Sequence, residues 1–591
     1  MSATSGATLE SGRNGVFPGN WAALGLYALL AVVLTWPLAA HLTDRLPAGD
    51  NDLWQNYWNF WWWRTAIFER GQLPYHTDLI YQPLEVSLAF HTHSEANVLL
   101  TLPLQWFGGV PLALNTAVLL SFILCAWGGY FLAREVVGDP RAAFVAGIVL
   151  GFFPHRMEQS LEHVNLASFQ AMPFFLAFFL RVLRQGGARS TVPAGLLFAL
   201  NALFAWHNGL LVVPLALVLF GHALAVGGRP RMLILRDTAL SGVVALVAML
   251  PFAWPMVREL LSGETYFVKP PVRKAIDPLF LFLPSEAHTI WGSLLAGVYE
   301  RLRGYASLGF TCYLGLVPIG LWIAGRWTSR RDWRLWSALF ALSIVLALGD
   351  TLVVAGSDTG APMPFAWLRK VPILSMVRLP NRFVVPAMVA LCVLCALGVR
   401  QLRRGWASWT AAAAIAVEFL ALPYPLRELP QPRWIEAARQ APEGILLNIP
   451  GGHRARGAED LYFQTLHSRP IAGGYASCIP PAMEKRVASL PYLELVFEGR
   501  PRPELEALEV EPALRRTLEA LSIRIVVVHL DRKREDLERR RAELRGTPQA
   551  RLANPEQGTR ARVVDETLAA MRRLWGEPAY EDREAAVFVR R

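Results

Sequence analysis

The feature that most constrains the fold of this chain is a series of long apolar segments that contain almost no charged residues. A helix needs about 20 apolar residues to cross the hydrocarbon core of a bilayer, so such segments predict transmembrane helices. From the length of these segments we expect about eleven crossings. They lie at residues 21–40, 111–132, 142–153, 164–180, 192–205, 209–226, 238–257, 307–324, 335–354, 383–399 and 408–422. Composition agrees, since 53% of the 591 residues are hydrophobic. The chain is therefore predicted to be an α-helical polytopic membrane protein.

Arginine clusters between the apolar segments predict the orientation in the membrane. They lie in the loops at residues 134–141, 181–189, 229–236, 326–334 and 400–404. Because cytoplasmic loops carry an excess of Lys and Arg, these loops should share the cytoplasmic side. The formal net charge of +11 is then explained by topology and by contact with membrane lipids, and no nucleic-acid partner is expected. We predict a multi-pass protein of a bacterial inner membrane with a cytoplasmic N-terminus.

The same pattern divides the chain into parts. Residues 1–20 form a cytoplasmic tail, and residues 21–425 form the transmembrane domain with a first periplasmic loop at 41–110. Residues 426–591 change character: the β-like runs GILLNI, IRIVVVHL and AAVFVR alternate with helical stretches such as 532–544. We expect a periplasmic α/β domain there. Its motif LYFQTLHSRPIAGGY, with His467 and Arg469, is either a contact surface against the membrane part or a plain strand and turn.

The first loop opens with the sequence AGDNDLWQNYWNFWWWR, which places two carboxylates beside a row of aromatic residues. A carboxylate at the membrane boundary is costly to desolvate, so Asp50 and Asp52 are candidate functional residues. The alternative is that they cap the helix that starts near Leu53. The tryptophans of this run have helical spacing and predict an interfacial aromatic belt, with sugar stacking by one ring as the second interpretation.

The predicted spans contain almost no ionisable side chains, with Glu418 and His222 as exceptions. Proton-coupled transporters usually need carboxylate or histidine relays within the bilayer, so this absence disfavours a transporter. Polar groups gather instead at the outer ends of the segments, where an enzyme would meet a lipid-borne substrate. The pair Cys392 and Cys395 has CxxC spacing but lies among small apolar residues, which favours helix packing over redox chemistry.

Five motifs resemble those of a known family. They are GDND at 49–52, YQPLE at 81–85, FPHRMEQSLEH at 153–163, LPSEAHTIWG at 283–292 and VRLPNRF at 377–383. Together with the order of spans and loops, they resemble the GT-C glycosyltransferases, and among these the bacterial polyprenyl-phosphate-sugar-dependent, protein-mannosyltransferase-like branch. The resemblance implies a GT-C-like fold and transfer of a sugar, with inversion, from a polyprenyl-phosphate carrier to an envelope acceptor on the periplasmic side. A non-catalytic member that binds or handles lipid-linked glycan is the alternative.

The resemblance also implies roles for individual residues. Asp50 best matches the acidic residue of the family's first loop and would be the catalytic base, with Asp52 as the substitute if the register differs. The candidates for binding lipid phosphate or sugar are Arg156, Arg378, Arg382, His163 and Glu95. A guanidinium can grip two phosphate oxygens, although each arginine could equally be a structural residue at the membrane interface.

A divalent metal is the one cofactor that the sequence brings into question. His91, His93 and Glu95 alternate as on a strand, so all three could face one ion. His155, Glu158, Glu162 and His163 form a second group at a helix mouth. Some GT-C enzymes use a metal and others do not, so hydrogen bonding to sugar or phosphate and plain interface polarity remain open for both groups.

Overall fold

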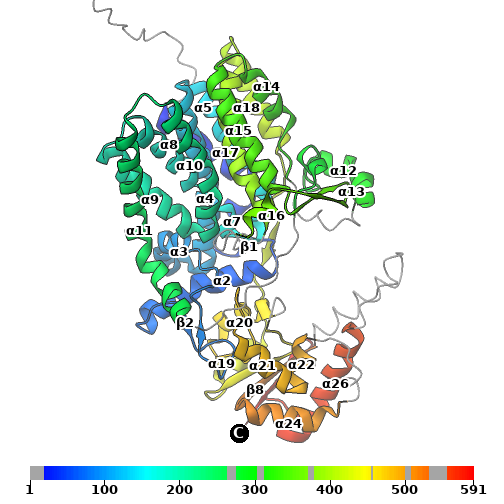
Figure 1. The fold of residues 1–591 in the computed structure, drawn as a ribbon. Coiled ribbons are helices and arrows are strands. Elements are labelled where there is room, and N and C mark those ends of the chain that lie inside the picture. The colour runs from blue at the N-terminus through cyan, green and yellow to red at the C-terminus, as the bar shows by residue number, and fades with distance from the viewer. Residues whose placement is uncertain are drawn as a thin grey trace, which may run out of the picture.

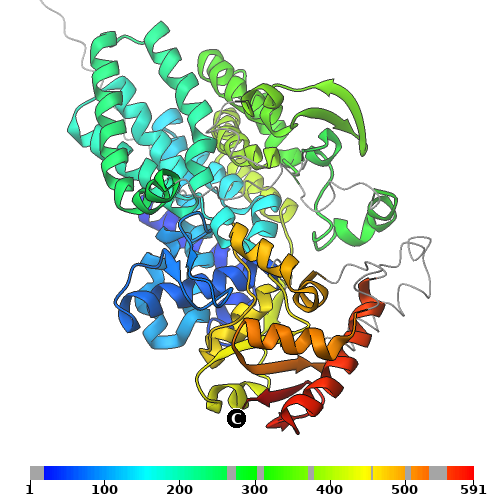
Figure 2. The same ribbon diagram turned by 60° about the horizontal axis from the view of Figure 1, so that its bottom comes forward.

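The computed structural model describes residues 19–262, 275–302, 312–370, 379–453, 457–498, 508–530 and 556–590. Apolar helices fill one end of the molecule, and a small sheet with its own helices fills the other (Figure 1). The first loop lies between these two parts. Figure 2 shows the C-terminal part, yellow to red, against the blue segments of that loop.

Most predicted spans correspond to apolar helices. In the described chain these are α1 (Asn20–Leu34), α4 (Gln105–Val137), α5 (Pro140–Phe152), α8 (Ala171–Arg184), α9 (Ala188–Phe204), α10 (Trp206–Val226), α11 (Arg231–Leu261), α14 (Leu316–Gly325), α15 (Arg330–Ala347), α17 (Val384–Val399) and α18 (Gly405–Glu418). Among the described residues, five helical stretches are long and apolar enough to cross a membrane: Glu95–Val137, Val164–Arg184, Trp206–Val226, Arg231–Leu261 and Pro380–Val399. The number of crossings therefore stays a prediction.

One predicted span is too long at its C-terminal end. Helix α15 stops at Ala347, and the residues that follow form β4 (Thr351–Val354), which pairs antiparallel with β5 (Ser357–Pro362). Gly349 has a φ of +84°, in the left-handed region that glycine adopts readily after a helix. The apolar run LVV thus belongs to a hairpin and not to the helix.

Helix α17 is the centre of the helical part, since every residue from Val384 to Val399 is buried. It packs against α4, α5, α14 and α15. Glycine at Gly398 allows the close approach of α14, because a Cβ there would collide with the Leu321 carbonyl. Cys392 and Cys395 are both buried in α17. The Cys392 thiol donates to the Val389 carbonyl of the same helix, and the Cys395 thiol donates to the Pro318 carbonyl of α14.

The first loop contains β1 (Arg45–Pro47), α2 (Asn51–Arg64), the short π-helix η2 (Thr65–Glu69), β2 (His76–Thr77), β3 (Val86–Ser87) and α3 (Glu95–Thr101). Strand β1 pairs antiparallel with β6 (Leu426–Glu428), which ties the loop to the start of the C-terminal part. All residues of α2 from Leu53 to Trp63 are buried. The aromatic run is therefore not an interfacial belt, and that prediction is wrong, because the C-terminal part covers the helix.

The C-terminal part is built on a four-stranded sheet in the order β7 (Ile445–Ile449), β8 (Ile523–His529), β10 (Ala585–Val589) and β9 (Tyr580–Glu581). Strands β7 and β8 are parallel, and the other pairs are antiparallel. The three β-like runs of the sequence are thus strands of one sheet. Its helices are α19 (Trp434–Gln440), α20 (Ala458–His467), α21 (Pro481–Ser489), α22 (Pro491–Glu498), α24 (Val510–Ala520) and α26 (Glu556–Trp575). The predicted helix at 532–544 lies outside the described residues.

The C-terminal part is joined to the first loop by backbone hydrogen bonds. The amide of Ile471 donates to the Leu79 carbonyl at 2.8 Å, and the amide of Tyr81 donates to the Gly473 carbonyl at 2.9 Å. From the buried face of α2, the Trp58 indole donates to Gln464 Oε1 at 2.7 Å. The motif LYFQTLHSRPIAGGY is thus a contact surface, the first of the two interpretations of the sequence, but it makes this contact through residues other than His467 and Arg469.

His467 and Arg469 stay within the C-terminal part. Arg469 donates its amide to His467 Nδ1 at 3.0 Å, and its guanidinium donates to the carbonyls of Ala438, Arg439 and Ala441. Burial and the neighbouring arginines lower the pKa of His467 to about 3, so it is neutral at physiological pH. These two residues therefore shape the loop that carries the contact.

Candidate functional site

A cavity of about 380 Å³ lies where the first loop, the helical part and the C-terminal part meet. Two short helices, α6 (Pro154–Glu162) and α7 (Val164–Ala167), and the turn η6 (Pro380–Phe383) contribute to its wall. The lining residues are Asn51, Asp52, His155, Gln159, Glu162, His163, Leu166, His207, Asn208, Leu211, Leu379, Asn381, Arg382, Val385 and Tyr475. Polar and titratable side chains make up most of this set.

Residues at three helix N-terminal ends line the cavity. Asn51 and Asp52 begin α2, His207 and Asn208 begin α10, and Asn381 and Arg382 begin the η6–α17 stretch. The N-terminal end of a helix carries a partial positive charge, so it favours an anion nearby. The cavity combines these ends with the Arg382 guanidinium, which suits a phosphate group.

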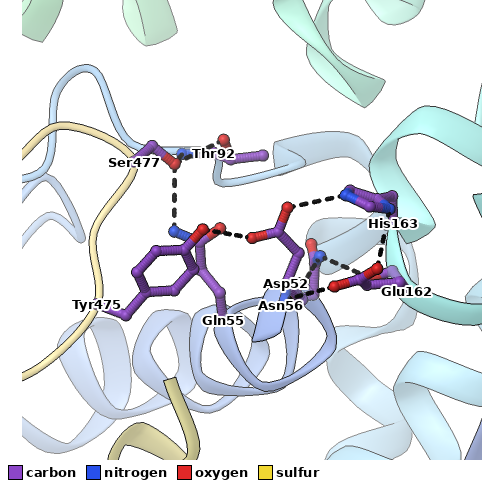
Figure 3. Close-up of polar contacts among 8 residues, drawn as sticks. All are labelled: Asp52, Gln55, Asn56, Thr92, Glu162, His163, Tyr475 and Ser477. Carbon is purple, nitrogen blue, oxygen red and sulfur yellow. Dashed lines mark hydrogen bonds and ion pairs between the residues drawn. The ribbon is translucent and has the colours of Figure 1, made fainter. Parts of the chain in front are cut away.

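Asp52 is the carboxylate at the centre of the site (Figure 3). The Tyr475 hydroxyl donates to Asp52 Oδ1 at 2.7 Å, and His163 Nε2 lies 2.8 Å from Oδ2. The backbone amide of Asp52 donates to Glu162 Oε1 at 3.2 Å. The side chain remains 29% exposed, so a ligand in the cavity can still reach it.

Asp50, the carboxylate that the family resemblance favoured, lies outside the cavity. It occupies the N-cap position of α2, its side chain is exposed, and it makes no side-chain capping hydrogen bond. Two residues further on, the helix has turned enough to aim Asp52 at α6. The geometry thus selects the second carboxylate of the GDND motif.

Asp52, Glu162 and His163 form the metal-ligand group found among the described residues. One ligand atom from each lies within 4.8 Å of the others, and all three side chains are partly exposed to the cavity. Two carboxylates and an imidazole are donors that Mn²⁺, Zn²⁺ and, through oxygen, Mg²⁺ accept. The donor set therefore fits a divalent cation.

Asp52 was in neither metal group proposed from the sequence, and Glu162 and His163 come from the second of them. Among the described residues, His91, His93 and Glu95 are not brought together as a set of ligands. His91 and His93 lie in an irregular loop rather than on a strand, because the chain turns there before Glu95 begins α3. His91 bonds to Asn59 Oδ1 at 2.8 Å and accepts from the Ser477 amide, while His93 accepts from the Trp63 indole and contacts the Leu88 carbonyl. Both rings are therefore engaged by protein groups on each side.

Glu95 and Arg156 also lie away from the cavity wall. Glu95 is buried and accepts from the Trp206 indole at 3.2 Å. The Arg156 guanidinium donates to Ser121, Gly151 and Ala167 and lies 4.0 Å from the Phe122 ring centroid. Arg156 thus holds helices together, which is the structural alternative raised for it. Arg378 lies outside the described residues, whereas Arg382 and His163 do line the cavity.

Electrostatics set the protonation states of two lining residues. Burial, with further contributions from Arg382 and His163, lowers the pKa of His155 to about 4, so this imidazole is neutral near pH 7. Burial and the Asp52 charge raise the pKa of Tyr475 well above its usual value. Its hydroxyl therefore stays protonated and acts as a donor to Asp52.

Several lining residues could not be found from the sequence. Tyr475, His207, Asn381 and Gln159 carry no spacing that separates them from ordinary interface residues. The only signal for Tyr475 is its place directly after a Gly pair in the motif already selected as a contact surface.

No protein-family model matches the chain, and a search of curated proteins finds no significant match. Among solved structures, the chain is similar to the arabinofuranosyltransferase AftD from Mycobacteria, with a TM-score of 0.54 and 16% identity over 87% of this chain. The alignment spans 35% of the AftD chain. At this identity, the likeness establishes a common fold.

Two further structures align at lower scores. The Archaeoglobus fulgidus oligosaccharyltransferase AglB, solved with an inhibitory peptide and a dolichol-phosphate, has a TM-score of 0.47 and 13% identity over 89% of this chain and 71% of its own. ArnT from Cupriavidus metallidurans has a TM-score of 0.40 and 15% identity over 96% of this chain and 97% of its own.

Proposed function

Because the chain has the fold of the GT-C glycosyltransferases, we propose that it transfers a sugar from a polyprenyl-phosphate carrier to an acceptor hydroxyl, with Asp52 as the catalytic base. The observation that carries this proposal is the position of Asp52. Its carboxylate faces a cavity at the N-terminal ends of α2, α10 and η6–α17, beside Arg382.

The chemistry needs one base and one site for an anionic leaving group. Asp52 takes the proton of the acceptor hydroxyl as its oxygen attacks the anomeric carbon of the sugar. The bond from that carbon to the phosphate oxygen breaks, and the lipid phosphate leaves with the electron pair. Arg382 and the helix N-termini stabilise the charge that develops on this phosphate. Attack from the face opposite the phosphate inverts the anomeric centre.

A divalent cation would be held by Asp52, Glu162 and His163. Such an ion would supply additional positive charge for the phosphate of the donor. His163 and Glu162 also act without an ion, because they fix the position of the Asp52 side chain and backbone.

The acceptor side of the reaction is proposed to be periplasmic, at the inner membrane. The arginine-rich loops at residues 181–189, 229–236 and 400–404 lie at the ends of helices away from the cavity's helix N-termini. The positive-inside rule assigns such loops to the cytoplasm. The contact between Tyr475 and Asp52 requires the first loop and the C-terminal part to share one side of the membrane.

Handling of lipid-linked glycan without transfer is the second candidate. It is favoured by one observation: both carboxylate oxygens of Asp52 already have partners, Tyr475 and His163. In that case the same cavity would bind the phosphate and sugar, and Asp52 would serve as a hydrogen-bond acceptor only.

Replacement of each carboxylate by its amide tests the proposal. Mass spectrometry of the purified protein identifies any co-purifying lipid-linked sugar, and transfer is then measured with farnesyl-phosphate forms of mannose, glucose and arabinofuranose. Asp52→Asn should lower transfer on the order of 100-fold or more, the loss expected for a general base. Asp50→Asn, the matched control two residues away, should retain wild-type transfer. If Asp52→Asn transfers sugar as well as the wild type, Asp52 is not the catalytic base, and the lipid-handling function becomes the better account.

A further inference from the structure

The segment at residues 473–477, here called the strap, brings the C-terminal part onto Asp52. It begins with the Gly pair of the contact motif and carries Tyr475 at its centre (Figure 3). Before Tyr475, the Gly473 carbonyl accepts from the Tyr81 amide at 2.9 Å, and the Gly474 amide donates to the Gly452 carbonyl at 2.9 Å. The strap is therefore tied on this side to both the first loop and the loop that follows β7.

The strap is held equally firmly after Tyr475. The Ala476 amide donates to the Tyr81 hydroxyl at 2.9 Å, and Ser477 Oγ lies 2.8 Å from Thr92 Oγ1 and accepts from Gln55 Nε2 at 3.2 Å. Tyr81 itself has a φ of +58°, an uncommon conformation for a residue with a side chain. The first loop thus accepts a strained residue at the point where it binds the strap.

Glycine is required at the two positions before Tyr475. Gly474 has a φ of +141°, and a Cβ there would lie 3.0 Å from the Ile80 Cβ. A Cβ at Gly473 would collide with the Gly452 carbonyl. The backbone therefore fixes the position of the Tyr475 Cα atom. Only rotation of the side chain about its own bonds can change its contact with Asp52.

The Tyr475 hydroxyl has the geometry that an acceptor hydroxyl needs. A general base must lie about 2.6–3.2 Å from the oxygen whose proton it removes, and Tyr475 Oη lies 2.7 Å from Asp52 Oδ1. The Tyr475 side chain is partly buried, and a tyrosine hydroxyl is protonated at neutral pH. A protonated hydroxyl thus already occupies the face of the base that substrate would use.

We propose that Tyr475 holds the place of the acceptor hydroxyl at Asp52 Oδ1 and keeps water off this one oxygen until the acceptor displaces the ring. This inference rests on the proposed function. The reaction that it prevents is hydrolysis of the donor. In that reaction, a water oxygen bonds to the anomeric carbon, its proton passes to Asp52, and the carbon–oxygen bond to the lipid phosphate breaks with the electron pair leaving on phosphate.

The test is donor hydrolysis in the absence of acceptor, measured with the full-length protein and farnesyl-phosphate mannose, glucose and arabinofuranose. Tyr475→Phe removes the hydroxyl and leaves room for a water beside Asp52. Hydrolysis should rise on the order of tenfold, the change that corresponds to one lost hydrogen bond to a charged group. Tyr475→Ala, which opens the place further, should hydrolyse donor at least as fast.

A matched control comes from the same part of the chain. Tyr492 is buried and bonds Thr567 Oγ1 at 2.7 Å, and it does not line the cavity. Tyr492→Phe therefore loses a tyrosine hydrogen bond of the same length outside the cavity and should leave hydrolysis unchanged. The double variant Asp52→Asn, Tyr475→Phe should lose the added hydrolysis, because the base that activates water is absent.

The outcomes separate the two proposals. If the wild type transfers sugar but Tyr475→Phe hydrolyses no more donor than the wild type, the inference is overturned while the proposed function stands. If the wild type shows neither transfer nor hydrolysis, labelling of Asp52 by a water-soluble carbodiimide and glycine amide, quantified by mass spectrometry, decides whether Tyr475 covers the carboxylate. Several-fold more labelling in Tyr475→Phe supports the cover, and equal labelling rejects it.

Discussion

Gly49 packs directly against the backbone of Glu162: a Cβ on Gly49 would lie 2.7 Å from the Glu162 Cα and would collide with the Leu161 carbonyl. This contact brings the start of α2 against the end of α6, although the two residues lie in different segments of the chain. The Arg427 guanidinium donates to the Gly49 carbonyl at 2.6 Å and holds the same turn from the other side. The glycine of the GDND motif therefore sets the distance between Asp52 and Glu162.

Gly49→Ala should separate α2 from α6, because the added methyl group has no space against backbone atoms. We expect a loss of stability of about 1–3 kcal/mol, the usual cost of overpacking, and a loss of transfer from the displaced Asp52. Thermal unfolding in detergent and the transfer assay measure both effects. Gly25→Ala is the control, since a Cβ at Gly25 meets nothing within 4 Å. If Gly49→Ala has the same thermal stability and the same transfer activity as Gly25→Ala, the turn at Gly49 can accommodate the added methyl group.

Arg382 should act through its planar guanidinium and not through charge alone. Arg382→Lys keeps the charge but loses the two parallel hydrogen bonds that a phosphate can accept. We expect turnover to fall on the order of tenfold, with a corresponding rise in the KM for the lipid-linked donor. Arg330→Lys changes an exposed arginine at the start of α15 and should have no effect. Full activity of Arg382→Lys would make Arg382 an anchor of the η6–α17 stretch.

A divalent cation added to the purified protein should bind at Asp52, Glu162 and His163. Glu162→Gln removes one charged ligand but keeps its size, and it should abolish stoichiometric binding of Mn²⁺, followed by calorimetry or by metal analysis after gel filtration. Glu69→Gln, an exposed carboxylate of the first loop, is the control. If wild type and Glu162→Gln bind Mn²⁺ equally, the three residues serve only to orient the Asp52 side chain.

His155 predicts how stability depends on pH. Its folded pKa of about 4 lies below the unfolded value of about 6.5, so the unfolded chain takes up the proton first. The contribution of His155 to the free energy of unfolding is complete above the unfolded pKa and is lost as pH falls through the folded pKa. Between about pH 7.5 and pH 5, the loss should be on the order of 2 kcal/mol. His155→Gln should lack this part of the dependence in thermal unfolding, whereas the exposed control His76→Gln should keep it.

The orientation in the membrane can be measured with fusions. A reporter placed after Arg591 should behave as periplasmic, and one placed near Arg330 as cytoplasmic. The first result follows from the contact of Tyr475 with Asp52, since the C-terminal part and the first loop must share a side. A cytoplasmic reporter signal after Arg591 would move the whole cavity to the cytoplasmic face.

The sequence predicted the features that depend on local pattern. Apolar length predicts helices such as α10 and α17, and short apolar runs with β-branched residues predict β7, β8 and β10, because both signals act over a few consecutive residues. The acidic first-loop motif and the helix mouth at residues 153–163 were also found, since polar groups at a membrane boundary stand out against apolar neighbours.

What the sequence could not predict depends on contacts between distant segments. The choice between Asp50 and Asp52 depends on how α2 is rotated toward α6, and a shift of two residues on a helix changes the direction of a side chain by roughly 200°. Arg156 resembles a phosphate ligand until the carbonyls of Gly151 and Ala167 are found around it. The tryptophans of α2 resemble a membrane belt because a tryptophan that packs against lipid and one that packs against protein leave the same pattern.

The hydroxyl that covers Asp52 belongs to a residue 423 positions later in the chain. Synthesis at roughly 5–20 residues per second separates the two residues by on the order of 20 to 85 s. During this interval, the carboxylate and its partners on α6 have already left the ribosome, while the strap has not been made. A chain whose translation stops before residue 475 would therefore insert its helices and carry Asp52 uncovered, which makes complete synthesis a condition for control of the site.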